Sequence, residues 1–290
     1  MKPQVRIAGR PVGSGHPCYL VAEIGINHNG DLEIAKMLMQ LAKRAGFEAV
    51  KFQKRTIEVV YTSEELAKPR EHPWGTTNGD LKRHLEFGQD DYSQIDRFAR
   101  ELGIVWFASC WDEGSVDFID RFDPPAYKIA SPSLTDDALI RYMRSKGKPI
   151  ILSTGMSTPA QIDHAVEVLG TNHLILLHSS STYPAKYEEL NLACIRAFQE
   201  RYPTVPVGYS GHETGLASTV AAVALGASLV ERHITLDRAM FGTDQAASLG
   251  PSGFEKLIRD IRLAETAIGD GVKRILDGEI PIMKKLRRVG

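Results

Sequence analysis

Short apolar runs alternate with amphipathic segments along almost the whole chain. Eight of these runs are rich in the aliphatic and aromatic residues that favour β-strands: YLVAEIG, EAVKFQ, IVWFAS, AYKIAS, PIILST, LILLHSS, VPVGYSG and SLVERHI. Most of them are apolar at successive positions and not only at alternate ones. This pattern predicts strands that are buried on both faces, as the strands of a parallel sheet are.

The segments between the runs carry the signals of helices. Residues 31–47 place Ile34, Leu38 and Leu41 at helical spacing, with a glycine near the end as a stop. Residues 135–148 begin with acidic side chains and end with basic side chains and a glycine, which complements the helix dipole. Comparable patterns occupy residues 157–170, 214–227 and 251–269. We therefore predict that helices connect the strands.

Strand–helix units in series predict an α/β fold. Eight such units fit a (β/α)8 or TIM barrel, and a doubly wound sheet is the alternative. The stretch VRIAGRPVGSG predicts a small N-terminal β-hairpin, at about residues 4–14, that closes the barrel floor. We predict one TIM-barrel domain over residues 1–290, with the barrel at about residues 18–270 and a C-terminal tail to 290. Residues 58–91 are polar and contain several Pro and Gly, which predicts a long loop over the barrel mouth.

The composition limits the expected cellular location and the expected classes of binding partner. The 35 Lys and Arg residues nearly balance the 36 Asp and Glu residues, so the formal net charge is −1. This balance gives no electrostatic reason to bind nucleic acid or an anionic membrane, although it is compatible with a local anion pocket. The three cysteines, Cys18, Cys110 and Cys194, are widely spaced, as expected in a reducing cytoplasm. The N-terminus lacks a signal-peptide core and no apolar run could span a bilayer, so we expect a soluble cytoplasmic protein.

Polar side chains stand at the ends of most of the predicted strands. In a βα barrel the carboxyl ends of the strands meet at one rim, where catalytic groups gather. In chain order these side chains are Glu23, Lys51, Gln53, Ser109, Cys110, Lys128, Ser131, Ser133, Ser153, Thr154, His178, Ser179, Ser180, Ser181, Tyr183, Ser210, His212, Glu231 and His233, with Asp244 in the loop beyond. A barrel built for stability alone does not need such a ring. We therefore predict a shared polar cavity at this rim.

Two lysines and two histidines in this ring suggest specific ligands. Lys51 and Lys128 have apolar neighbours, so we expect their ammonium groups to point into the barrel mouth and to bind phosphate or carboxylate oxygens together with nearby hydroxyls. The alternative is an edge lysine with its head in water. His212 and His233 close successive strands, and adjacent imidazoles suit a divalent transition metal; the alternative is a pair of ordinary core or surface histidines. Asp244 either belongs to the site or merely initiates a turn.

Several motifs together resemble the catalytic barrel of the sialic acid synthases. They are AEIGINHNGD, VKFQ, YKIAS, PIILSTGM, GYSGH, GASLVERHIT and GTDQAASLGP, in this order and spacing, and they extend over nearly the whole chain. The resemblance implies a transferase that condenses phosphoenolpyruvate with an open-chain sugar aldehyde, an aldose or amino-aldose. The products would be a 2-keto-3-deoxy sugar acid and phosphate, released by C–O cleavage. The resemblance also implies a homodimer.

A role for each matched position follows from the same resemblance. Lys51, Lys128, Ser131, Ser153 and Ser210 fall where the family binds the phosphate and carboxylate of phosphoenolpyruvate. His212 and His233 match the ligands of its divalent metal, Mn²⁺. Glu23, Gln53, Tyr183 and Asp244 match residues around the sugar acceptor. The expected catalytic residues are Glu23, Lys51, Lys128 and Asp244, and Glu23 is the expected acid–base group.

Some positions depart from the family pattern. Ser133 stands where a Glu is usual, Ser181 replaces an Asn, and the third strand ends in Ser-Cys-Trp in place of Ser-Thr-Pro. The sequence stops at MKKLRRVG, where typical members continue into an antifreeze-like domain that caps the partner subunit's site and contributes an arginine. We therefore expect the phosphoenolpyruvate half of the site to follow the family and the sugar half to differ. A separate cap protein, or a different aldose, would fit this expectation.

Two other functions also fit the residues. One is a Schiff-base aldolase in which Lys51 or Lys128 attacks pyruvate. The other is a non-catalytic barrel that binds a phosphorylated or acidic sugar as a sensor or partner subunit. A pyruvate adduct trapped by borohydride would indicate the first function, and tight phosphoenolpyruvate binding without turnover would indicate the second.

Overall fold

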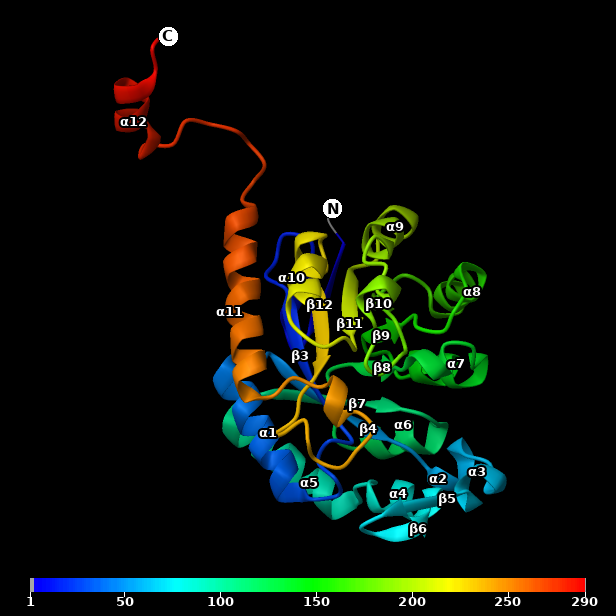
Figure 1. Ribbon diagram of the computed structural model, residues 1–290. Helices are drawn as coiled ribbons and strands as arrows, with labels where there is room; N and C mark the ends of the chain where they lie inside the picture. Colours follow the sequence, from blue (N-terminus) through cyan, green and yellow to red (C-terminus); the bar gives the residue numbers. More distant parts are fainter. Residues whose placement is uncertain (1–2, 290) are drawn as a thin grey trace.

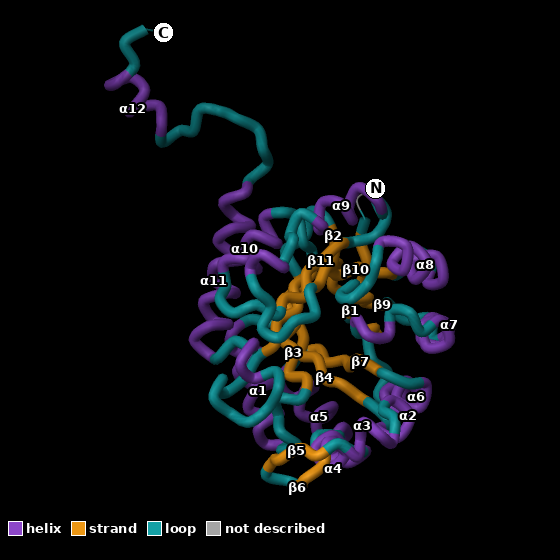
Figure 2. The backbone as a smooth tube through the Cα atoms, turned by 45° about the vertical axis from the view of Figure 1, so that its right-hand side comes forward, coloured by secondary structure: helices purple, strands orange, loops and turns teal. Residues whose placement is uncertain are grey.

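Eight parallel strands close into a barrel in the computed structural model, which describes residues 3–289 (Figure 1, Figure 2). The strands are β3 (Tyr19–Gly25), β4 (Ala49–Lys54), β7 (Val105–Cys110), β8 (Tyr127–Ile129), β9 (Ile150–Ser153), β10 (Leu174–Ser179), β11 (Val207–Gly211) and β12 (Leu229–His233). They follow one another in chain order, and β12 pairs with β3 to close the barrel. This closed order is that of a TIM barrel and not of a doubly wound sheet, so the predicted fold is confirmed.

Helices surround the barrel and form its outer layer (Figure 2). They are α1 (Leu32–Ala45), α5 (Gln89–Leu102), α6 (Glu113–Asp120), α7 (Asp137–Ser145), α8 (Pro159–Leu169), α9 (Cys194–Arg201), α10 (Ala217–Ala224) and α11 (Pro251–Ile268). Local signals set their ends. The Asp31 side chain accepts hydrogen bonds from the Glu33 and Ile34 amides at the start of α1, and Gly46 ends that helix at φ 103°. A helix lies within each of the five segments in which the sequence predicted one.

A β-hairpin closes the amino-terminal end of the barrel. It consists of β1 (Gln4–Ile7) and β2 (Arg10–Gly13), which pair antiparallel. Val5, Ile7 and Val12 are buried in one cluster with inward side chains of the barrel strands, among them Tyr19 and Leu229. Because only one face of the hairpin is covered, β1 alternates between exposed and buried residues. The hairpin therefore fills the barrel floor with apolar side chains, as the sequence indicates.

The alternation of side chains along each strand decides what faces the barrel interior. In the first half of the strands the inward positions are apolar, as Val21 and Phe107 are, and they form one cluster with the hairpin. Two residues further along the same face come Glu23 and Ser109. The strand register places polar residues of neighbouring strands opposite each other, and Glu23 lies opposite Lys51 in the pairing of β3 with β4. A polar layer therefore covers an apolar interior at the carboxyl ends of the strands.

Residues 58–91 are more ordered than the long loop that the sequence predicted. The elements of this region are α2 (Ile57–Val60), α3 (Ser63–Ala67), β5 (Pro69–His72), β6 (Gly75–Thr77) and α4 (Asn78–His84). Thr77 and Asp80 form a capping box that starts α4 directly after β6. The Trp74 ring, in the turn between β5 and β6, stacks on His84 with ring centroids 4.3 Å apart. The expectation of a loop was wrong because elements this short leave no periodic pattern in the sequence.

The last two helices differ in their contact with the barrel. α11 packs on it through Phe254, Leu257 and Ile261, which are buried. The chain then extends outward and ends in α12 (Glu279–Leu286), which lies apart from the barrel (Figure 1). Ile282 and Leu286 of α12 are exposed. Within residues 3–289, no helix combines the length and the apolar character needed to cross a membrane.

A fully buried ion pair joins the last two strands on the outer side of the barrel. Arg232 of β12 donates to Glu213, which follows β11, with 3.2 Å between Nη1 and Oε1. Glu213 also accepts hydrogen bonds from the hydroxyls of Tyr209, Ser218 and Thr219. Burial alone would raise the pKa of Glu213, but the charge of Arg232 and the hydroxyl donors lower it below its usual value. The pair therefore ties the ends of β11 and β12 together.

We expect Arg232→Met to lower the free energy of unfolding by about 3–5 kcal/mol, because the substitution leaves Glu213 charged and buried without its counter-ion. Chemical denaturation monitored by circular dichroism measures the change. Arg259→Met on the exposed face of α11 is the matched control and should change stability by less than about 0.5 kcal/mol. The double variant Glu213→Gln/Arg232→Met should recover part of the loss. A loss of less than about 1 kcal/mol for Arg232→Met would show that the pair does not hold these strands.

Candidate active site

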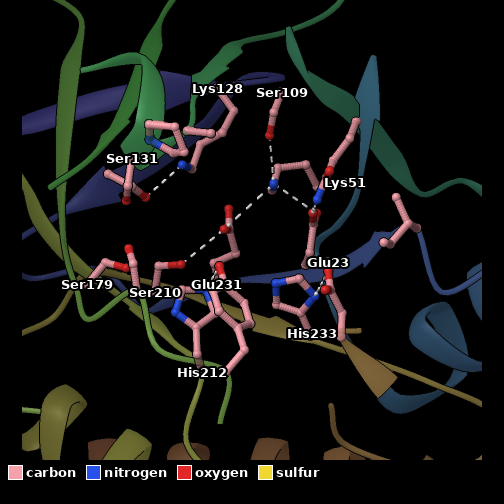
Figure 3. Close-up of a pocket in the computed structure, with 18 of the residues that line it drawn as sticks. Glu23, Lys51, Ser109, Lys128, Ser131, Ser179, Ser210, His212, Glu231 and His233 are labelled. Atoms are coloured by element: carbon pink, nitrogen blue, oxygen red, sulfur yellow. Dashed lines mark hydrogen bonds and ion pairs between the residues drawn. The ribbon is translucent and has the colours of Figure 1, made fainter. Parts of the chain in front are cut away.

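All eleven side chains that the sequence singles out line one cavity of about 300 Å³ at the carboxyl ends of the strands (Figure 3). They are Glu23, Lys51, Gln53, Lys128, Ser131, Ser153, Tyr183, Ser210, His212, His233 and Asp244. A volume of this size is at the lower end of the range for small-molecule sites. The structure therefore brings every residue to which the resemblance assigned a role to the same cavity.

The ammonium group of Lys51 lies between two buried carboxylates. Its Nζ is 2.9 Å from Glu23 Oε2 and 3.7 Å from Glu231 Oε1, and it donates to Ser109 Oγ at 2.8 Å (Figure 3). Gln53 donates to the other oxygen of Glu23 at 2.8 Å. The strand register explains the cluster, because Glu23 lies opposite Lys51 and the next strand on the other side, β12, carries Glu231. One cation therefore stabilises two carboxylates that would otherwise repel each other.

This arrangement separates the acidities of the two carboxyl groups. Burial is the largest effect on Glu23 and raises its pKa above the usual value, although Lys51 opposes the rise. Burial would also raise the pKa of Glu231, but Lys51 and Lys128 together lower it below the usual value. Burial alone would lower the pKa of Lys51, but the two carboxylates raise it, so this lysine stays charged. Glu23 is therefore the carboxyl group that can exchange a proton more readily near neutral pH.

Lys128 supplies the second ammonium group of the cavity. Its Nζ donates to Ser153 Oγ at 2.6 Å and to the carbonyl oxygen of Ile129 at 3.0 Å. Burial lowers the pKa of Lys128 to about 8, because the attraction of Glu231 only partly offsets the loss of water. Nearby, Ser131 Oγ accepts a hydrogen bond from the Gly155 amide. Two lysines and several hydroxyls therefore converge, which is a donor set suited to phosphate and carboxylate oxygens.

The two histidines lie side by side, with ring centroids 5.4 Å apart. His212 Nδ1 is 2.6 Å from the carbonyl oxygen of Ser180, which can only accept, so Nδ1 carries the proton and Nε2 is free to accept. The Tyr183 hydroxyl lies 2.9 Å from that Nε2 and donates to it. His233 Nδ1 is buried, has no hydrogen-bond partner among residues 3–289, and is 3.7 Å from Asp244 Oδ2. Burial lowers the pKa of His212 to about 4 and that of His233 to about 3, so both imidazoles are neutral near pH 7.

These features fit a divalent cation. Neutral imidazoles are the form that binds metals, and the unpartnered Nδ1 of His233 is a buried polar atom that needs a partner. Among the described residues no three His, Cys, Asp or Glu side chains gather closely enough to hold an ion by themselves. The protein would therefore supply the imidazoles of His212 and His233, and the substrate and water would fill the other coordination positions.

Several members of the polar ring do not line the cavity. Cys110 is buried in the outer core, Ser133 belongs to the turn after β8, and Thr154 donates to the carbonyl oxygen of Leu177. His178 lies 2.7 Å from the carbonyl oxygen of Leu190 on the outer side of β10. His178 occupies the opposite face of the strand from Ser179, because successive side chains alternate.

Other cavity residues received no role from the sequence. They are Arg55, Lys82, Ser109, Trp111, Ser179, Ser181, Glu231 and Thr243, with four apolar residues. Four of them, Ser109, Ser179, Ser181 and Glu231, belong to the polar ring that the sequence predicted, and Glu231 faces the cavity because it precedes His233 by two positions on the same side of the strand. The sequence pattern did not indicate Arg55 or Lys82. Arg55 follows the end of β4, and Lys82 belongs to α4, a helix in the region where the sequence predicted a loop.

A parallel βα barrel with this rim belongs to the class of enzymes that act on small anionic substrates. Comparison with known proteins specifies the class. Residues 38–273 match the NeuB family. The human N-acetylneuraminate-9-phosphate synthase is 42% identical over 283 residues, which cover 96% of this chain and 79% of the human enzyme. The N,N'-diacetyllegionaminic acid synthase of Legionella pneumophila is 35% identical over 96% of this chain and 81% of its own length.

A solved structure agrees with this assignment. The crystal structure of N-acetylneuraminic acid synthetase from Leptospira borgpetersenii, in complex with citrate, superposes with a TM-score of 0.87 at 27% identity and covers 100% of this chain and 99% of its own. The chain belongs to the NeuB family. Enzymes of this family condense phosphoenolpyruvate with a sugar to form keto-deoxy sugar acids, and they are in general metal-dependent. The expectation of a sialic acid synthase-like enzyme is thereby confirmed, and a barrel that only binds its ligand is not supported.

We expect phosphoenolpyruvate to bind the free protein most tightly below about pH 8 and progressively more weakly above it. The pKa of Lys128 is lowered to about 8, so the ammonium form that attracts the anion is lost as the pH rises through that value. Isothermal titration calorimetry between pH 6.5 and about 9.5 measures the decline. Lys128→Arg should remove the decline because arginine stays charged. Lys43→Arg on the surface is the control and should leave it unchanged. A decline near pH 8 that persists in Lys128→Arg would assign it to another group.

Proposed function

We propose that this chain joins phosphoenolpyruvate to a sugar aldehyde, with Lys51 and Lys128 holding the anion and His212 and His233 holding a divalent cation. The observation that carries the proposal is the single cavity in which two buried lysines face an adjacent pair of neutral imidazoles. Lysines suit a highly charged anion and imidazoles suit a transition metal, and the reaction needs both. The names of the two relatives given above, both of them synthases, agree with it.

In this proposal the lysines and three hydroxyls hold phosphoenolpyruvate. The ammonium groups neutralise its phosphate and carboxylate, and Ser131, Ser153 and Ser210 donate hydrogen bonds to the remaining anionic oxygens. The support is that each lysine already donates to a serine hydroxyl, at 2.8 Å for Lys51 and 2.6 Å for Lys128. These donors are held in place before the ligand arrives, so little side-chain freedom is lost on binding.

The proposed acid–base group is Glu23. Carbon C3 of phosphoenolpyruvate attacks the aldehyde carbon, a C–C bond forms, and Glu23 protonates the aldehyde oxygen, which becomes a hydroxyl. The Glu23 carboxylate then takes a proton from the water that adds to C2. The C2–O bond breaks, phosphate leaves with the bridging oxygen and takes the remaining proton of the added hydroxyl, and C2 becomes the ketone. The pKa of Glu23, raised first of all by burial, supports both proton transfers. Gln53, Tyr183 and Asp244 orient the acceptor by hydrogen bonds to its hydroxyls.

We propose Mn²⁺ as the bound cation. When bound, a divalent cation supplies Lewis acidity that polarises the carbonyl group of the acceptor. The two imidazoles suit a transition metal better than they suit Mg²⁺, which prefers oxygen ligands.

We also propose that a second copy of the chain, or a separate cap protein, covers the cavity mouth. Met156 and Tyr183 line the cavity but are 67% and 46% exposed, which is unusual for large side chains at a closed substrate site. The exposed apolar residues of α12 offer a surface for a homodimer contact.

The proposal also includes one domain over the whole chain and a cytoplasmic location. The three free cysteines agree with a cytoplasmic location.

We expect the metal-loaded protein to release phosphate from phosphoenolpyruvate only in the presence of an aldose and to form a 2-keto-3-deoxy acid. Phosphoenolpyruvate labelled with ¹⁸O at the bridging position should yield labelled phosphate, because the proposal breaks the C2–O bond. Mass spectrometry of the phosphate and of the acid measures both products. Glu23→Gln should lower kcat by about 10²-fold or more. Folded, metal-loaded protein that forms no acid with any aldose of a broad panel would contradict the proposal.

The metal itself gives an independent expectation. His212→Ala and His233→Ala should each lower the bound manganese measured by mass spectrometry and by electron paramagnetic resonance, while the affinity for phosphoenolpyruvate in calorimetry should change much less. His164→Ala, on an exposed face of α8, should leave the metal content unchanged. Full metal content in both single variants would show that the cation binds elsewhere.

A Schiff-base mechanism is the second candidate, because a lysine with a pKa lowered to about 8, as Lys128 has, is more often unprotonated and nucleophilic at neutral pH. Borohydride in the presence of pyruvate would then add a three-carbon unit to Lys128, seen as a mass increase of the intact protein. The condensation with phosphoenolpyruvate forms no imine, so the mass should remain unchanged.

A further inference from the structure

A second, smaller cavity of about 80 Å³ lies beside the main one. The two cavities are adjacent, because both are lined by Ile26, Arg55, Lys82 and Thr243. The smaller cavity lies between α4, with Leu81, Lys82 and Leu85, and the loop that carries Phe241, Gly242 and Thr243. None of the catalytic groups proposed above lines it.

Three cations and no carboxylate line this second cavity. The cations are Arg55, Arg70 and Lys82. Arg55 lines the cavity but is only 7% exposed. Its Nε donates a hydrogen bond to Glu86 at 2.6 Å. That pair leaves the rest of the guanidinium group directed toward the Tyr61 hydroxyl and the two cavities. The surplus of positive charge at one small cavity is the signature of an anion site.

Three acidic residues of this region are already paired with cations. Glu58 binds Arg83, Glu65 binds Lys68, and Glu86 binds Arg55 and Lys54. Within residues 3–289, Arg70 and Lys82 have no ion-pair partner; Arg70 lies 3.3 Å from the Asn78 amide oxygen, and the Lys82 ammonium lies over the Tyr61 ring at 4.0 Å. Two cations held by neutral partners in a cavity remain available to an anionic ligand.

Aromatic packing fixes the two walls relative to each other. Trp74 stacks on His84 of α4 and meets Phe241 edge-on, with ring centroids 5.5 Å apart. His84 Nε2 also contacts the carbonyl oxygen of Asn29 at 3.0 Å. The helix that carries Lys82 is therefore anchored both to the loop before α1 and to the loop that carries Thr243. This anchoring gives the second cavity a defined shape before any ligand binds.

We infer that the second cavity binds a phosphate monoester at the far end of the sugar acceptor, so that the substrate is an aldose phosphate. This inference rests on the proposed condensation. Asp244, which faces His233, directly follows Thr243 of the second cavity, so an acceptor whose aldehyde lies at the imidazoles extends along this loop toward Arg55, Arg70 and Lys82. Guanidinium and ammonium groups together satisfy a dianionic phosphate, whereas a neutral hydroxyl would leave them without a counter-charge.

Carbon numbering gives a consistency check. The condensation adds three carbons ahead of the aldehyde carbon, so carbon 6 of a hexose becomes carbon 9 of the acid. The human relative is named as a 9-phosphate synthase, whereas the Legionella relative is named for an acid without phosphate. The names of the relatives therefore include both kinds of product, and the cationic cavity of this chain suits the phosphorylated kind of acceptor.

The test compares matched acceptors on the full-length, metal-loaded protein: N-acetylmannosamine and mannose, each with and without a 6-phosphate. We expect kcat/KM to be at least about tenfold higher for the phosphorylated member of a pair. Arg70→Met and Lys82→Met should each raise KM for the phosphorylated acceptor by about tenfold and change KM for the parent sugar by less than about threefold. The matched control is Arg83→Met, the neighbour of Lys82 on α4, which is paired with Glu58 outside the cavity and should change neither value.

The outcomes separate this inference from the proposed function. Turnover of both members of each pair with equal kcat/KM would overturn the phosphate site and leave the condensation standing. Absence of turnover with all four acceptors would count against the condensation itself. If Lys82→Met and Arg70→Met raise KM for phosphoenolpyruvate instead, the cations serve that substrate and the inference is wrong. Circular dichroism of each variant excludes unfolding as the cause, and Arg55 is left intact because its pair with Glu86 is buried.

Discussion

The buried cluster of Lys51 with Glu23 and Glu231 is the interaction on which the rest of the site depends. Two carboxyl groups this deep in a protein would ordinarily be neutral, and a lysine would lose its proton. Placed together, Lys51 and Glu231 retain their charges because each supplies counter-charge that water would otherwise provide, while the pKa of Glu23 is raised toward neutrality. The cluster also makes the carboxyl groups unequal, since Glu231 faces two ammonium groups and Glu23 faces one. A carboxyl group with a raised pKa, the proposed acid–base group, and a fixed anion therefore arise from a single arrangement.

The barrel makes this cluster possible because side chains on the inner and outer faces of its strands make different contacts. Inward side chains at the rim carry the chemistry, and the apolar layers and the hairpin below them exclude water. Outward side chains position the rim. Glu213 and Arg232 directly neighbour the two proposed metal ligands in sequence, and their buried ion pair joins the strand ends from the outside. The imidazoles of His212 and His233 are therefore held in place by contacts that no substrate reaches.

The region between β4 and α5 covers part of a rim that the barrel alone would leave open, and it carries the specificity that we infer. Its short helices are held by Glu86, which pairs with Lys54 and Arg55 at the end of β4, and by the ring of Trp74. These contacts bring Arg70 and Lys82 beside the end of the acceptor cavity. Changes in this region could therefore alter the preferred sugar without disturbing the catalytic layer.

The sequence by itself determined the barrel and the helices predicted between its strands, because apolar strands and helix caps are local signals. The eleven side chains that converge were selected from the strand-end polar residues by the resemblance of the motifs to the sialic acid synthases. The predicted ring of strand-end polar residues also contained Glu231, which lines the cavity although no role was assigned to it. Only the tertiary structure decided which carboxyl group has the raised pKa, which face His178 occupies, and how Arg55, Arg70 and Lys82 meet. The reason is physical: a pKa, a cavity wall and a counter-charge depend on groups far apart in the chain, and their distances are set only when the barrel closes.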